Sequence, residues 1–203
     1  MNEIFKKYGF SLTRDTIKKF ETYKDLLIEW NKIINLTAIT DENEIIIKHF
    51  IDSYSISQKI FVSNNIKTVL DMGTGAGFPG IIGGILNPEI KFTLVDSVNK
   101  KITFLEEVIQ KLELKNIYPK HHYLDKKNSS GKKFDIVISR AFMKPHKLIY
   151  FAKNYVNKNG FHIMLLTENQ KNNFLDTIAK YKPEILTYPY EEKFRYILKF
   201  KQL

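Results

Sequence analysis

Residues 68–80, with the sequence TVLDMGTGAGFPG, have the composition and spacing in this chain that point most specifically to chemistry. A short apolar run ends at Asp71 and Met72, and four glycines follow within eight residues. Glycines at this density let the backbone turn sharply and pass close to a bound molecule. The segment therefore predicts a nucleotide or nucleoside site at the carboxyl end of a strand.

Two classes of cofactor fit these glycines in different registers. Residues 75–80 match G-x-G-x-x-G, the dinucleotide fingerprint, in which a helix N-terminus holds a pyrophosphate. The second register, Asp71-x-Gly73-x-Gly75-x-Gly77, is characteristic of S-adenosylmethionine-dependent methyltransferases. A carboxylate at the strand end repels a pyrophosphate but suits an ammonium or a sulfonium. We therefore expect these four residues to bind S-adenosylmethionine.

A second acid, Asp96, supports a nucleoside cofactor. It ends the next strand-like run, FTLVD, about 20 residues after the glycines, where an acid binds ribose hydroxyls. Either acid could instead serve only the turn that follows its strand. Taken together with the glycines, the two acids predict a nucleoside site.

Alternating elements have to position these residues. Strands are expected at residues 66–72, 90–96, 116–123, 134–140 and 160–166, and helices are expected after Gly77, Asn99, Lys144 and Glu168. This alternation predicts a doubly wound α/β sheet, which binds ligands at the carboxyl ends of its strands. Residues 183–190 and 194–200, on either side of a charged turn, predict an antiparallel hairpin added to the parallel sheet.

The segment before the first strand has helical spacing. Apolar residues recur along residues 13–30, with Thr13 or Asp15 available as the cap, and a second helix is expected from Asp41. We therefore divide the chain into a helical extension, residues 1–60, and a Rossmann-like domain, residues 61–203.

Composition narrows the function further. The 203 residues carry a formal net charge of +10, which predicts a polyanionic partner such as nucleic acid, although scattered lysines could be only a solvated surface. The chain has no cysteine, which excludes disulfides and a thiolate nucleophile. No apolar run is long enough for a membrane span, so we expect a cytoplasmic protein. The histidines lack metal-ligand spacing, so no metal is expected.

Four segments of the chain resemble one known family. GTGAGFPG, LVDSVNKKITFLEEV and FDIVISRAF, with WNKIINLTAITDENEIIIKHFIDS upstream, are similar to the RsmG family, also called glucose-inhibited division protein B. Phe-Pro in the glycine segment and Ser-Arg-Ala-Phe are the specific features, since generic methyltransferases rarely have Phe-Pro there. The resemblance implies a cytoplasmic bacterial enzyme that methylates N7 of one guanine in the 530 loop of 16S ribosomal RNA.

The resemblance also implies roles for individual residues. On the cofactor side these residues are Gly73, Phe78, Asp96, Leu124, Asp125 and Arg140, the last of which would also face the substrate. On the RNA side they are Asn35, Thr37, Lys48, His49 and Arg195. We add Lys100, which opens a helix on the expected ligand edge. His122-Tyr123 and Leu166-Thr167 depart from the family, which commonly has Gly-Arg and Lys-Gly there.

The chemistry of methyl transfer to guanine N7 limits which atoms Arg140 can contact. Guanine N7 has a free lone pair and no proton to lose, so methyl transfer needs alignment and electrostatics but no general base. A donor on N7 would block the reaction, so we expect Arg140 to contact O6, a phosphate or the cofactor carboxylate. The alternative for Arg140 is a strand-end ion pair.

Several readings of the whole protein remain open beside a monomeric methyltransferase that acts on the small ribosomal subunit. A dehydrogenase would need a substrate domain, and the chain is too short for one after residue 165. A small-molecule methyltransferase would gain nothing from the positive charge. A ribosome-assembly protein could bind S-adenosylmethionine without catalysis, and the departures at residues 122–123 and 166–167 keep that alternative open.

Overall fold

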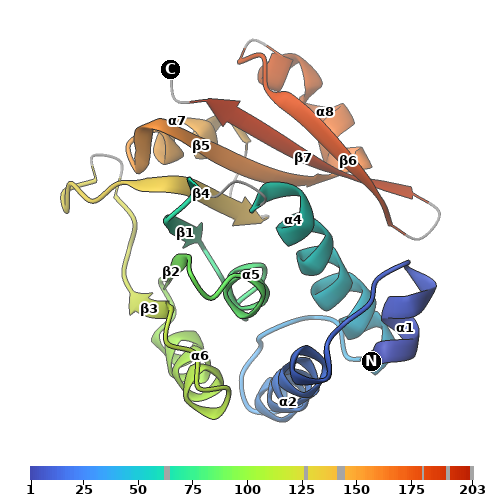
Figure 1. The fold of residues 1–203 in the computed structure, drawn as a ribbon. Coiled ribbons are helices and arrows are strands. Elements are labelled where there is room, and N and C mark those ends of the chain that lie inside the picture. The colour runs from blue at the N-terminus through green and yellow to red at the C-terminus, as the bar shows by residue number, and fades with distance from the viewer. Residues whose placement is uncertain (62–64, 126–127, 141–144, 180, 191–192, 202–203) are drawn as a thin grey trace.

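The computed structural model of the protein describes residues 1–61, 65–125, 128–140, 145–179, 181–190 and 193–201. In these residues one seven-stranded sheet has the order β3-β2-β1-β4-β5-β7-β6 (Figure 1). The first five strands in this order, β3, β2, β1, β4 and β5, are parallel, and β7 runs antiparallel to both β5 and β6. The strands are β1 (Thr68–Met72), β2 (Lys91–Asp96), β3 (Ile117–His121), β4 (Phe134–Arg140), β5 (Val156–Thr167), β6 (Glu184–Tyr190) and β7 (Lys193–Lys201).

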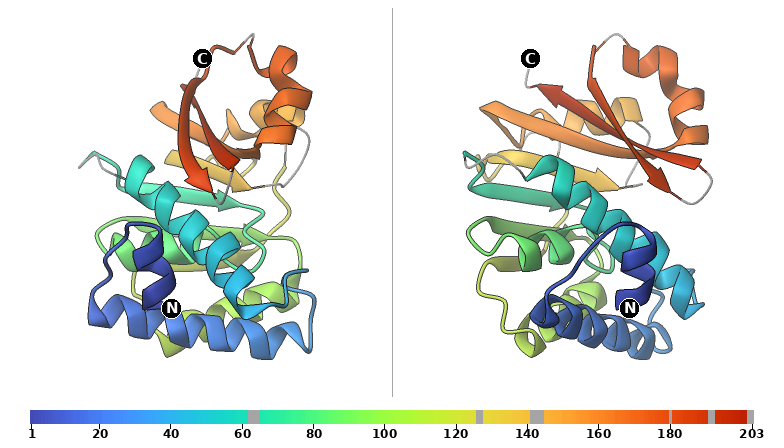
Figure 2. Two further views of the ribbon diagram at one scale, coloured as in Figure 1. Left: turned by 90° about the vertical axis from the view of Figure 1, so that its right-hand side faces the viewer. Right: turned by 45° about the vertical axis from the view of Figure 1, so that its right-hand side comes forward.

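Helices pack on both faces of this sheet. They are α1 (Asn2–Lys7), α2 (Arg14–Asn31), α3 (Glu42–Ile45), the π-helical turn η1 (Ile46–Ile51), α4 (Asp52–Ile60), α5 (Gly80–Leu86), α6 (Asn99–Lys111), α7 (Pro145–Ala152) and α8 (Glu168–Ala179). Helix α2 lies at the end of the molecule opposite the β6–β7 hairpin, whereas α4 lies against the hairpin (Figure 2). No helix in the described residues is long and apolar enough to cross a membrane.

Alternate residues of β1, β2, β4, β5 and β7 enter two separate hydrophobic clusters. In β4, Ile136 and Ile138 pack with α2, α4, α5 and α6, whereas Val137 packs on the other face with α7. This alternation follows from the two-residue period of a strand. The N-terminal helices therefore share one core with the sheet, and the division of the chain at residue 60 stays a prediction.

The expected elements are present, with differences at their ends. Thr13 caps α2 by accepting a hydrogen bond from Thr16 N at 3.1 Å, and Asp41 caps α3 in the same way through Glu44 N at 2.8 Å. β5 begins four residues earlier than expected, at Val156. The helix from Asp41 contains the unexpected π-turn η1. A π-turn widens the helix and is often found at functional sites.

Candidate active site

The loop after β1 is held by the carboxylate at the end of that strand. Asp71 is fully buried, and its Oδ2 accepts hydrogen bonds from Thr74 Oγ1 at 2.8 Å and from Gly80 N at 2.9 Å. Gly73 N and Thr74 N both donate to Val95 O of β2. Oδ1 of Asp71 has no hydrogen-bond partner among the described residues. Asp71 therefore joins Thr74 and Gly80 of the loop through one oxygen, and its other oxygen can accept a hydrogen bond from another donor.

Three glycines of the loop have left-handed backbones. Gly73, Gly75 and Gly77 have φ angles of 72°, 61° and 96°. A Cβ on Gly77 would lie 2.6 Å from Ile81 and 2.7 Å from Leu105, whereas a Cβ on Gly75 would meet nothing within 4 Å. Gly77 is therefore required by close packing, and the space beside Gly75 is open to a ligand.

Gly77→Ala is expected to lower the free energy of unfolding by about 2–5 kcal/mol, because it adds an overpacking cost to the left-handed cost. Gly131→Ala is the matched control, since Gly131 has a φ of 64° and nothing within 4 Å of its Cβ position. The control should lose only about 1–2 kcal/mol in the same urea titration. Equal losses in the two variants would contradict the packing argument.

Asp96 at the end of β2 reaches back to the glycine loop. Its Oδ2 accepts from Gly75 N at 2.9 Å, and its Oδ1 accepts from Val98 N at 3.0 Å. Lys101 Nζ lies 3.7 Å from Oδ2. Each carboxylate oxygen has two lone pairs, so these contacts leave room for a ribose hydroxyl. The two acids named from the sequence thus lie on one loop, Asp71 inside it and Asp96 at its edge.

Burial, with a smaller contribution from the charge of Asp96, raises the pKa of Asp71 to about 6 against the opposing effects of Thr74, Gly80 and Arg140. A pKa above the unfolded value means that the folded state binds the proton more tightly, so this contribution to stability is lost as the pH rises from about 4 to above 6. Relative to Asp71→Asn, the wild type should lose about 2–3 kcal/mol of unfolding free energy between pH 4 and pH 7. Urea titrations across that range measure the difference, and parallel curves would contradict it.

Phe78, which follows these glycines, is a core residue. Its side chain is 2% exposed and lies between two rings in nearly parallel planes, Tyr23 at 4.9 Å and His49 at 4.9 Å. The Tyr23 hydroxyl donates to Ala76 O of the same loop. The cofactor contact of Phe78 stays a prediction, but its ring connects the glycine loop to α2 and η1.

His49, which stacks on Phe78, also contacts Arg140 at the end of β4. Arg140 Nη2 lies 3.3 Å from His49 Nδ1, and His49 Nε2 lies 2.8 Å from Thr37 Oγ1. Since a guanidinium can only donate, Nδ1 is the acceptor and the ring proton lies on Nε2. Burial and then the charge of Arg140 lower the pKa of His49 to about 3, so the ring is neutral. The neutral His49 ring therefore positions the Arg140 guanidinium without repelling its positive charge.

Asp52 is a residue of this contact network that sequence reasoning missed. It is 5% exposed, and its carboxylate lies 3.6 Å from Arg140 Nη1 and 3.6 Å from Arg195 Nε. The Tyr188 hydroxyl donates to Asp52 Oδ1 at 2.6 Å. Burial raises the pKa of Tyr188, and Asp52 raises it further. One buried acid thus joins two of the three arginines. A signal was present, since Lys48, His49 and Asp52 recur at helical spacing.

A cleft of about 510 Å³ borders this network. Lys48, Arg195, Tyr190 and the half-exposed Phe194 line it, together with Thr167, Glu168, Asn169 and Asn172. Arg195 stacks on the Tyr190 ring at 4.0 Å, and Lys48 Nζ pairs with Glu44 at 2.7 Å. Lys48 and Arg195, both predicted from the sequence, therefore face the same cleft from η1 and β7.

The remaining predicted residues do not line this cleft. Leu124 lines a separate cavity of about 260 Å³, together with Val95 and His122. The backbone of Asp125 exchanges hydrogen bonds with the Tyr155 hydroxyl. Asn35 and Lys100 are exposed.

Part of the Ser-Arg-Ala-Phe motif lies outside the described residues. Residues 141–144, which include Phe142, are among those that the structure does not describe. The turn at residues 191–192 of the hairpin also lies outside them.

Comparison with known proteins finds one family. The family model GidB, described as rRNA small subunit methyltransferase G, matches residues 16–187. A Ribosomal RNA small subunit methyltransferase G from Lachnoclostridium phytofermentans is 47% identical over 158 residues, which cover 76% of this chain and 65% of that protein. The same-named protein of Clostridium perfringens is 44% identical over 164 residues, covering 79% of this chain and 68% of its own length. The chain therefore spans just under two thirds of the first of these relatives.

Solved structures share the fold. A SAM dependent methyltransferase from Aquifex aeolicus superposes with a TM-score of 0.61 at 14% identity, covering 77% of this chain and 93% of that one. This confirms the predicted Rossmann-like fold of class I S-adenosylmethionine-dependent methyltransferases, with an antiparallel C-terminal hairpin. At this identity the likeness concerns the fold alone.

Proposed function

Because the chain belongs to the GidB family, rRNA small subunit methyltransferase G, we propose that it methylates N7 of one guanine in the 530 loop of 16S ribosomal RNA. The methyl donor is S-adenosylmethionine. The observation that carries the proposal is the chain of contacts that links the glycine loop to Arg140, through Phe78 and His49. These contacts support the proposal because they join the glycine loop after β1 to Arg140 at the end of the neighbouring strand β4. The same proposal implies a cytoplasmic location.

The residues present fit the cofactor. The unpartnered, buried Oδ1 of Asp71 can accept from an ammonium or from a water bound to it. The open space at Gly75 admits a ligand against the backbone, and the carboxylate of Asp96 lies at the same place. Bound S-adenosylmethionine would supply an electrophilic methyl group on its sulfonium. We propose that Asp71, Gly73, Gly75, Gly77 and Asp96 hold it.

Arg140 supplies electrostatic stabilisation and alignment in this proposal. His49, Asp52 and the carbonyl of Lys48 restrain its guanidinium, which remains 27% exposed. A restrained cation aimed at a substrate oxygen costs little reorganisation during reaction. We propose that it donates to guanine O6 or to a phosphate and leaves N7 free. No residue has to act as a base, since N7 carries no proton.

The cleft beside Arg140 suits an RNA strand next to the target guanine. Lys48 and Arg195 offer positive charge for phosphates, and Phe194, 52% exposed, offers a ring on which a base can stack. Thr37 and His49 act indirectly in this proposal, since Thr37 contacts His49 and His49 contacts Arg140. RNA contacts of Asn35 and Lys100, and cofactor contacts of Phe78, Leu124 and Asp125, remain part of the proposal.

The test is transfer of labelled methyl from S-adenosylmethionine to 30S particles that lack this modification. Protein-free 16S RNA, tRNA and a small-molecule extract are the comparison substrates. Label recovered as 7-methylguanosine in 16S RNA is the expected result. Label in the extract alone would favour a small-molecule methyltransferase. Tight cofactor binding with no label in any substrate would favour a non-catalytic assembly protein.

A further inference from the structure

A cavity on the face of the sheet opposite Arg140 takes no part in the proposed reaction. It has a volume of about 170 Å³ and is lined by Ile149, Tyr150, Lys153, Val156, His162, Tyr181, Phe200 and Lys201. His162 and Phe200 are cross-strand neighbours on β5 and β7, Ile149 and Tyr150 come from α7, and Lys153 follows the end of that helix. Since residues alternate between faces, His162 and Arg140 point to opposite sides of the sheet.

His162 is an unexplained polar group inside this cavity. Its side chain is 4% exposed, and Nε2 lies 3.2 Å from Ser139 Oγ. Nδ1 is buried and has no hydrogen-bond partner among the described residues. Burial lowers the pKa of His162 to about 3, so the ring is neutral. A buried polar atom without a partner costs free energy, so its retention calls for an explanation.

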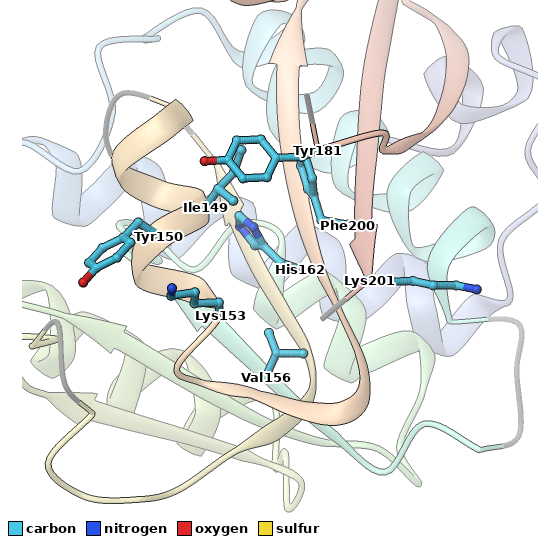
Figure 3. A pocket seen from close by; sticks show the side chains of 8 residues that line it. All are labelled: Ile149, Tyr150, Lys153, Val156, His162, Tyr181, Phe200 and Lys201. Atoms are coloured by element: carbon cyan, nitrogen blue, oxygen red, sulfur yellow. The ribbon is translucent and has the colours of Figure 1, made fainter. Parts of the chain in front are cut away.

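The surroundings of His162 define what could satisfy it. Figure 3 shows its ring among Ile149, Tyr181 and Phe200, with Lys153 below the ring and the Lys201 ammonium directed away. Phe200 stacks on the imidazole at 5.7 Å, and Tyr181 meets Phe200 edge-on at 6.3 Å. Lys153 Nζ lies 4.5 Å from the Tyr150 ring. The cavity thus has aromatic walls, one buried imidazole nitrogen and a cation at its rim.

We propose that this cavity binds a small hydroxylated aromatic carboxylate. Its ring packs against Ile149 and Phe200, its hydroxyl bonds to Nδ1 of His162, and its carboxylate pairs with Lys153. A hydroxyl both donates and accepts, so it satisfies Nδ1 in either tautomer. An apolar cavity of about 150 Å³ is known to hold one benzene ring, so this volume suits one ring with its carboxylate at the opening.

The test uses 4-hydroxybenzoate as probe and isothermal titration with the full chain. Benzoate lacks the hydroxyl and 4-hydroxybenzamide lacks the charge, and each should bind about tenfold more weakly, as one lost polar interaction of about 1.4 kcal/mol implies. Saturating S-adenosylmethionine should not displace the probe, because the two sites lie on different faces. Binding is measured without methyl transfer, so it is independent of the proposed function.

Two variants separate the polar contacts from plain cavity filling. Lys153→Gln should weaken binding about tenfold, whereas Lys158→Gln, the same charge change on β5 outside the cavity lining, should not. His162→Phe should bind benzoate and 4-hydroxybenzoate equally, with retained S-adenosylmethionine binding as the check of folding. The proposal is overturned by no binding, by equal affinity of the wild type for the three probes, or by equal losses in the two lysine variants.

Discussion

Arg140→Ala should reduce methyl transfer to the small ribosomal subunit about 10²–10³-fold, the usual cost of removing one preorganised donor at a reacting centre. The guanidinium stands at the end of β4, next to the glycine loop, and three groups of the protein restrain it. Its loss would remove the proposed interaction with the substrate but no hydrogen bond of the glycine loop. Single-turnover assays with labelled S-adenosylmethionine, beside cofactor titrations, measure the effect.

Two further variants make the test of Arg140 specific. Arg140→Lys keeps the positive charge but not the planar fork, so it should lose nearly as much activity. Arg14→Ala removes an exposed arginine at the start of α2 and should leave the rate unchanged. Full activity in Arg140→Ala would end the proposed role, and equal losses in Arg140→Ala and Arg14→Ala would show that only net charge matters.

Asp52→Ala should lower the free energy of unfolding by about 3–5 kcal/mol, the cost of breaking a buried charge pair by removing one partner. The substitution would leave Arg140 and Arg195 facing each other without the carboxylate between them. It would also leave the Tyr188 hydroxyl without its acceptor. Since a whole domain is stable by only about 5–15 kcal/mol, urea titration should show a large shift of the midpoint.

The matched control is Asp15→Ala, which removes an exposed acid that pairs with Lys19 one helical turn away. Exposed pairs of this kind contribute about 0.3–0.5 kcal/mol. Asp52→Asn keeps an acceptor for Tyr188 but not the charge, so its loss should fall between those of the two alanine variants. If Asp52→Ala cost no more than Asp15→Ala, the carboxylate would not be the centre of the network.

The order of elements and one half of the site could be predicted from the sequence. Strand and helix periods, the glycine spacing and the acids at two strand ends are local patterns, and the expected elements are present. Because parallel strands bring their carboxyl ends to one edge, Asp71 and Asp96 had to meet at the same loop.

The arginine half of the site required the tertiary structure. Asp52, Arg140 and Tyr188 lie on three elements, and the Tyr188–Asp52 hydrogen bond joins residues 136 positions apart. No local period specifies such a contact. The burial of His49 and its contact with Arg140 also required the tertiary structure, while the RNA contact expected from its sequence position stays a prediction.

The sequence by itself therefore determined the class of fold, the position of the glycine loop and the family, because these depend on backbone conformation and on short spacings. Only the tertiary structure decided which side chains are buried and paired. It placed Phe78 between Tyr23 and His49, joined Arg140 to Arg195 through Asp52, and left His162 unsatisfied in a cavity. The physical reason is that burial and charge pairing arise where distant segments pack together, and residue order does not specify that packing locally.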